Sequence, residues 1–144
     1  MSTATPHTEK THRATTGTFT ATVNDEPNFD AKDVSVTLQP SIEIHGIQDS
    51  FDSPIRTISI GLAPDIKNGD YVFKEHDEVR QMQVIASSSS SLYVTLAATL
   101  HVDFDPANEH YAGRANIEAE DVFNGGRIIN VESAFDLHGV TSLK

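Results

Sequence analysis

The sequence predicts an all-β protein, either an antiparallel β-sandwich or a small β-barrel of about eight strands with a C-terminal meander. Three observations carry this prediction. Apolar and polar residues alternate with a period of two along most of the chain, turn-forming residues separate these runs, and no stretch keeps a helical period over three turns. Strands joined by short turns favour antiparallel pairing, but periodicity alone does not separate a sandwich from a barrel.

A single folded domain is expected, because 144 residues suit one unit with its own core. Residues 1–16 are rich in Thr, Ser and Ala and have few large apolar side chains, so we predict a flexible N-terminal tail there. Residues 17–144 carry the alternating pattern and form the predicted β domain.

Four alternating runs occupy the first half of the predicted domain. The longest begins at Val34 and contains Pro40, which cannot donate a hydrogen bond to a strand ladder. We therefore expect an edge strand there, or a bulged corner where the strand changes sheet. The Asn68-Gly69 pair predicts a tight turn before a short strand. The four runs span residues 17–23, 34–47, 55–62 and 71–73.

The second half contains a run over residues 79–86 and then three long runs that form the predicted meander. In the first of these, every second residue from Leu92 to Phe104 is apolar, so we expect all of them, Leu96 included, on the core face. The three long runs span residues 92–104, 111–123 and 127–138.

Matching the apolar faces of these three strands predicts the two turns between them, because a slip of one residue would turn a strand over. Asp105 is expected opposite His110, which leaves a four-residue loop. Phe123 is expected opposite Arg127, which leaves residues 124–126, where two glycines supply the left-handed backbone that such a loop needs.

The composition argues against several classes of function. The formal net charge of −11 disfavours nucleic acids and anionic membranes as partners. The absence of cysteine excludes disulfides, thiolate metal sites and a cysteine nucleophile. No apolar run is long enough for a transmembrane helix or a secretory signal, so a cytoplasmic location is expected. No cofactor is expected either, because the common nucleotide-binding and catalytic motifs are missing.

Asp103 and Asp105 have the spacing with which a calcium loop begins, but the residues that should follow do not fit that loop. Asp105 followed by Pro106 is instead typical of a type I turn, in which the carboxylate accepts from nearby backbone amides. We therefore predict a turn at this position.

The outer face of the meander carries the polar candidates for a site. The predicted register sets His101 opposite Arg114, with Asp103 beside His101, and this cluster could bind a metal ion through His101 and Asp103 or transfer protons. The alternative is a solvated strand face with cross-strand charge pairs, which is the commoner use of such residues.

The apolar face offers a second kind of site. If the sheet closes into a barrel, part of its lining could hold a small apolar ligand. The alternative is that these side chains only fill the space between one another. The residues concerned are Leu96, Leu100, Ile117, Val131 and Phe135.

Part of the sequence resembles a group of uncharacterised bacterial β-domains. The resemblance lies in "ISIGLAPDIKNGDYVF" and in the segment from Leu92 to Leu137, with Gly69 and Tyr71, then Gly113, then an aromatic residue at Phe135. It covers roughly the last 90 residues and implies a small all-β fold with no known activity. Many members of that group are lipoproteins, but the lipidated cysteine has no counterpart here.

We therefore expect a non-catalytic binding module rather than an enzyme. Its partner would be an unknown protein, or a second copy, adding to an exposed strand edge near Pro40. The alternatives are a barrel that binds a small apolar ligand and, third, an enzyme or metal-binding protein that uses His101, Asp103 and Arg114.

Overall fold

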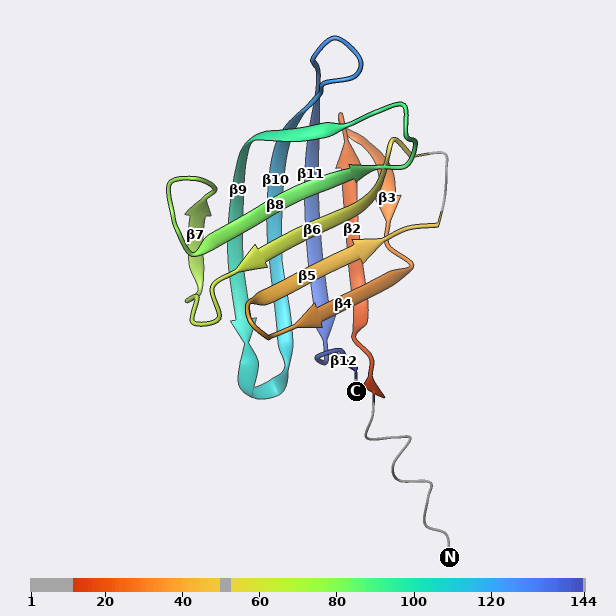
Figure 1. Ribbon diagram of the computed structural model, residues 1–144. Helices are drawn as coiled ribbons and strands as arrows, with labels where there is room; N and C mark the ends of the chain where they lie inside the picture. Colours follow the sequence, from red (N-terminus) through yellow and green to blue (C-terminus); the bar gives the residue numbers. More distant parts are fainter. Residues whose placement is uncertain (1–11, 50–52, 144) are drawn as a thin grey trace, which may run out of the picture.

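The computed structural model describes residues 12–49 and 53–143 and shows two antiparallel β-sheets packed face to face (Figure 1). The all-β prediction is confirmed, and of its two alternatives the sandwich is the one observed. Within the described residues, a six-stranded and a four-stranded sheet lie against each other without closing into a barrel. The helix that the structure describes is a 3₁₀ turn at Pro106–Asn108, and no described helix is long and apolar enough to cross a membrane.

The larger sheet contains the C-terminal meander, as predicted. Residues of the first half of the chain flank the meander on both sides, because β2 joins one side and β7 the other. The strands, in their order across the sheet, are β3 (Glu26–Asp30), β2 (Thr16–Val23), β11 (Arg127–His138), β10 (His110–Asp121), β9 (Tyr93–Asp105) and β7 (Gly69–Val72).

The smaller sheet is built from the middle of the chain and lies in front of the larger sheet in Figure 1. Pro40 falls in the turn of a hairpin, so the long run predicted there is two antiparallel strands rather than one edge strand or corner. The strands, in order, are β4 (Asp33–Thr37), β5 (Ile42–Ile47), β6 (Ile55–Leu62) and β8 (Val79–Ala86).

The folded part begins earlier than the tail prediction allowed. Strand β1 (His12–Arg13) pairs with β12 (Ser142–Leu143), and β2 starts at Thr16. Thr15 between them is buried, and its hydroxyl donates to the carbonyl of Gly139 and accepts from the amide of Val36. These hydrogen bonds explain why a segment with few apolar residues is ordered. Residues 1–11 of the predicted tail lie outside the described part.

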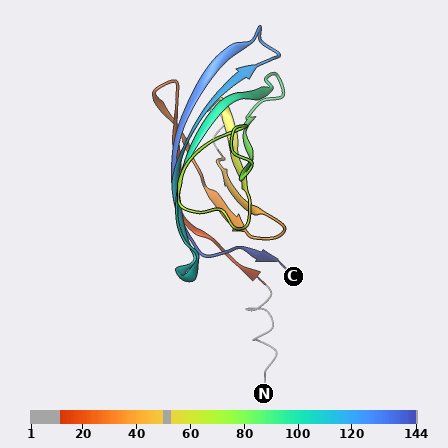
Figure 2. The ribbon, with the colours of Figure 1, turned by 90° about the vertical axis from the view of Figure 1, so that its left-hand side faces the viewer.

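Figure 2 shows the two sheets as separate layers, and the buried apolar side chains of both layers form one core. Phe19 of β2 packs at 5.4 Å from Phe135 of β11 and at 6.0 Å from Phe29, measured between ring centres. Gly113 of β10 leaves room for the Phe135 ring, because an added Cβ would lie 2.8 Å from that ring. Isoleucines and leucines of β5 and β6 supply the opposite side of the core.

Strand β9 changes phase in its middle. Ala97 pairs with Glu118 and Thr95 with Ala119, so Leu96 is an extra residue without a partner in the ladder, which is a β-bulge. Downstream of the bulge the apolar residues face the core as predicted. Upstream of it the prediction is wrong, because Tyr93 is buried there while its apolar neighbours face outward.

The first turn of the meander has the predicted register and the second does not. Asp105 pairs with His110 as expected, although the 3₁₀ turn replaces a simple type I turn and the Asp105 carboxylate accepts from the Asn108 side chain instead of a backbone amide. At the second turn, Asp121 pairs with Arg127 across a five-residue loop, so the register differs from the prediction by two residues.

Two of the edge strands, β4 and β3, have backbone groups that are already bonded within the chain. On β4, beside the turn that holds Pro40, the amide and carbonyl of Val36 bond to Thr15 and to the amide of Thr141. On β3, the buried side chain of Gln48 accepts from the amide of Asp30 and donates to the carbonyl of Asn28. These hydrogen bonds occupy some of the backbone groups that an added strand would need.

Candidate functional site

The outer face of the six-stranded sheet gathers the features that could recognise another molecule. Alternate residues of β9, β10 and β11 point away from the core and form rows across the sheet, as their register shows. Along the strands this face divides into three zones. An apolar zone lies at the end near the β10–β11 turn, a polar hollow lies in the middle, and a histidine cluster lies at the end near the 3₁₀ turn.

The apolar zone, which we call the apolar end surface, exists because of the bulge in β9. Leu96 is 41% exposed, and Leu92 and Val94 are exposed to a similar degree. Val122 donates its amide to the carbonyl of Leu92, which places the two side by side. Phe123 in the following turn is 61% exposed. The apolar end surface consists of Leu92, Val94, Leu96, Val122, Phe123 and Ile128.

Acidic side chains lie within and beside this surface. Glu120 pairs with Val94 on one side and with Ile128 on the other, so a carboxylate lies between two exposed apolar side chains. Glu118 follows one row further along the same face and is exposed. The surface is therefore apolar with a negative charge inside it, a combination that suits an apolar partner carrying positive charge.

The turn that presents Phe123 is held by Asp121. The Asp121 carboxylate accepts hydrogen bonds from the amides of Leu92 and Phe123 and from the side chain of Asn124. Burial by itself raises the pKa of this carboxyl, but these bonds and one from Ser91 outweigh it and bring the pKa below its ordinary value of 3.8. The turn is thus fixed to the start of β9 by an ionised side chain.

The middle zone is a hollow of about 910 Å³ that crosses the sheet. Arg114 and His101 lie opposite each other in it, as predicted, and His101 Nδ1 is 2.8 Å from the carboxylate of Asp70 on β7. Hydroxyl, amide and carboxylate groups make up most of the remaining outward side chains of the lining, which include Thr20, Thr22, Asp30, Thr99, Asn116 and Glu132. Apolar side chains such as Pro27, Val72 and Ala134 also line the hollow, so its lining is mixed and does not by itself select a class of ligand.

The five residues predicted to line an apolar pocket do not form one together. Leu100, Ile117, Val131 and Phe135 are buried in the core between the sheets, where they contact other apolar side chains. Leu96 points outward at the bulge. Of the five, Leu100 alone borders the hollow on the outer face.

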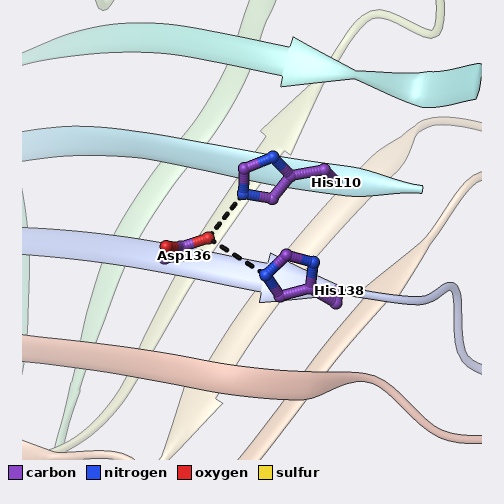
Figure 3. Close-up of side chains that lie close together, drawn as sticks. All are labelled: His110, Asp136 and His138. Atoms are coloured by element: carbon purple, nitrogen blue, oxygen red, sulfur yellow. Dashed lines mark hydrogen bonds and ion pairs between the residues drawn. The ribbon is translucent and has the colours of Figure 1, made fainter. Parts of the chain in front are cut away.

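The histidine cluster was not predicted from the sequence. His110, the first residue of β10, lies opposite His138, the last residue of β11, and Asp136 lies on the same face (Figure 3). His110 Nε2 is 2.5 Å and His138 Nε2 is 3.5 Å from the same Asp136 oxygen. The two imidazole rings are stacked 4.4 Å apart. The predicted register of the second turn hid this cluster, because it set His110 opposite residue 140.

The metal pair predicted from the sequence lies elsewhere on this face. His101 and Asp103 are successive outward residues of β9, and the carboxylate that contacts the His101 ring belongs to Asp70 rather than to Asp103. Within the described residues, the group that brings three metal-ligating atoms within 4.8 Å of one another is His110, Asp136 and His138.

Comparison of the chain with models of protein families, with curated proteins and with solved structures found no match. The resemblance to bacterial β-domains therefore stays a prediction, and a proposal of function depends on the geometry of the outer face alone.

Proposed function

We propose that this protein is a non-catalytic interaction module that binds a protein partner through the apolar end surface. The observation that supports the proposal is the exposure of six large apolar side chains at one end of one sheet face. Exposed apolar residues that occur singly need no explanation, whereas a group of them marks an interaction site in many proteins. The bulge at Leu96 adds to the argument, because bulges often re-aim side chains next to functional sites.

The charge of the molecule indicates the chemical character of the proposed partner. Glu118 and Glu120 accompany the apolar side chains, and the whole chain has a net charge of −11. Two copies of the chain would repel each other at this surface, whereas a partner with basic residues around an apolar segment would be attracted to it. The proposed partner is therefore a different protein with an apolar segment flanked by Lys or Arg.

The mode of binding follows from the covered edges. Val36 on β4, beside the turn that holds Pro40, already bonds through its amide and its carbonyl to groups of the same chain, so an added strand would have to displace these bonds. Side chains of the apolar end surface are accessible without any such rearrangement. The geometry therefore favours a partner that docks its side chains onto the sheet face over a partner that adds a strand to the sheet.

A selection of random peptides displayed on phage tests this proposal even though the identity of the partner is open. We expect enriched peptides to combine apolar and basic residues and to lose binding to the double variant Leu96→Thr/Phe123→Ser. Thr99→Ala, on the same strand but in the hollow, is the matched control and should bind them normally. Equal binding to the double variant, or no enrichment at all, would remove the proposal.

Sedimentation of the wild type separates a foreign partner from self-association. We expect a monomer at low ionic strength, because like charges on the apolar end surface are least screened there. A stable dimer that disappears in Leu96→Thr/Phe123→Ser would show that the surface binds a second copy and would overturn the choice of a foreign partner.

A further inference from the structure

The geometry points to a second, independent site: His110, Asp136 and His138 bind a divalent transition-metal ion of the zinc class. The site lies at the end of the sheet face opposite the apolar end surface. It requires neither a partner protein nor the function proposed above.

The strand register brings the three side chains together. His110 and His138 are directly opposite each other on neighbouring antiparallel strands, and Asp136 is two residues from His138, so all three point to the same side of the sheet. Figure 3 shows the Asp136 carboxylate facing both rings, with one of its oxygens joined to each. The possible ligand atoms lie within 4.8 Å of one another. A zinc ion with bonds of about 2.0–2.2 Å holds its ligand atoms at most about 4.4 Å apart, so a small approach of these three side chains would bring them into range.

The chemistry of the three ligands selects the class of metal. Two imidazoles and one carboxylate suit zinc, nickel and copper, whereas calcium and magnesium prefer sites made of oxygen atoms alone. Three protein ligands leave coordination positions for water or for a further ligand. The net charge of −11 adds a general attraction for cations.

Binding requires a small movement of the rings. They are nearly parallel, at an angle of 3°, so their nitrogen lone pairs do not yet converge on one point. The side chains of His110 and His138 are 36% and 58% exposed, which leaves them free to rotate about their χ angles. Metal binding should therefore separate the stacked rings, a change that the imidazole signals in an NMR spectrum would report.

Zinc titration of the full-length protein by calorimetry tests this inference. We expect one zinc ion per chain and a loss of affinity of more than about tenfold in His138→Ala, since even groups that only support metal ligands cost that much when removed. His138→Gln keeps the size of the side chain and should show the same loss. His101→Ala is the matched control, because His101 is also beside a carboxylate on this face and should leave zinc binding unchanged.

A second control separates this site from the histidines near the N-terminus. The double variant His7→Ala/His12→Ala should bind zinc as the wild type does. Loss of binding in that variant would place the ligands outside this cluster and overturn the inference. So would a wild type that binds no zinc, or a His138→Ala variant that binds it normally.

Discussion

The two halves of strand β9 have the same alternating sequence and opposite surroundings. From Ala98 to Phe104 every second residue is apolar and buried against the smaller sheet. From Leu92, the residue just before β9, to Leu96 every second residue is also apolar, but it faces solvent. One extra residue at the bulge produces this difference, because the side chains of a strand change face at each residue.

This difference shows that alternation of apolar residues identifies one face of a strand. It does not tell whether that face is buried within the chain or exposed. The downstream half is covered by the chain itself. The upstream half turns Tyr93 inward, and Thr95 donates its hydroxyl to the carbonyl of Met82 on β8. These two residues hold the start of β9 against the smaller sheet, and Leu92, Val94 and Leu96, which alternate with them, are exposed.

The largest expected effect on stability comes from comparing two leucine-to-alanine substitutions, one in each half of β9. Leu100→Ala should lower the free energy of unfolding by about 2–5 kcal/mol, because Leu100 is 2% exposed and its loss leaves a cavity. Leu96→Ala should change it by about 0.5 kcal/mol or less, because Leu96 is exposed. Urea unfolding of the two variants measures the contrast. A similar loss in both would mean that Leu96 is covered within the same chain.

Adding a methyl group at Gly113 of β10, which pairs with Val102 in the buried half of β9, should have a smaller but clear effect on the free energy of unfolding. In Gly113→Ala the new Cβ would meet the carbonyl oxygen of His101 and lie 2.8 Å from the Phe135 ring. Overpacking of this kind costs about 1–3 kcal/mol, which urea unfolding would detect. Ala112→Ser, on the outward side of the same strand, is the control and should unfold like the wild type. Unchanged stability of Gly113→Ala would contradict the close packing between β10 and Phe135.

The smallest expected effect concerns the turn beside the exposed half and depends on pH. The lowered pKa of Asp121 means that its ionised form stabilises the fold above the ordinary value of 3.8, and that this stabilisation is lost as the pH falls through the folded-state pKa below it. Asp121→Asn should therefore unfold at lower urea concentration than the wild type at pH 7, and the gap should narrow near pH 3.

Asp103→Asn, an exposed aspartate of the same sheet face, is the control for this measurement. A gap between Asp121→Asn and the wild type that is as large at pH 3 as at pH 7 would show that the charge of Asp121 is not what holds the turn.

Much of the fold could be predicted from the sequence because alternation and turn residues are local signals. The meander, the run 79–86 and the register of β9 with β10 downstream of the bulge follow from them. The bulge at Leu96 could not be predicted, since the alternation continues through it and the contacts that accompany it, such as Thr95 with Met82 on β8, join different sheets. The five-residue turn depends on the hydrogen bonds of Asp121, and a three-residue loop was equally compatible with the apolar pattern.

The residues of the candidate site divide in the same way, into those that could be predicted from local signals and those that could not. The pairing of His101 with Arg114 was predictable from the phase of two neighbouring strands. The histidine cluster depends on the register of the second turn, and an error of two residues there sets His110 opposite residue 140 instead of His138. Once that register is known, Asp136 and His138 are recognisable as alternate residues on one face.

Strand β10 also sets the distance between the two proposed sites. It runs without interruption from His110 to Asp121, and the ten steps from His110 to Glu120 span about 34 Å at the rise of an antiparallel strand. A molecule bound over Glu120 would therefore stand clear of an ion bound beside His110, so that both could be carried at once. Probes attached at these two ends would keep a fixed separation whichever of the two is occupied.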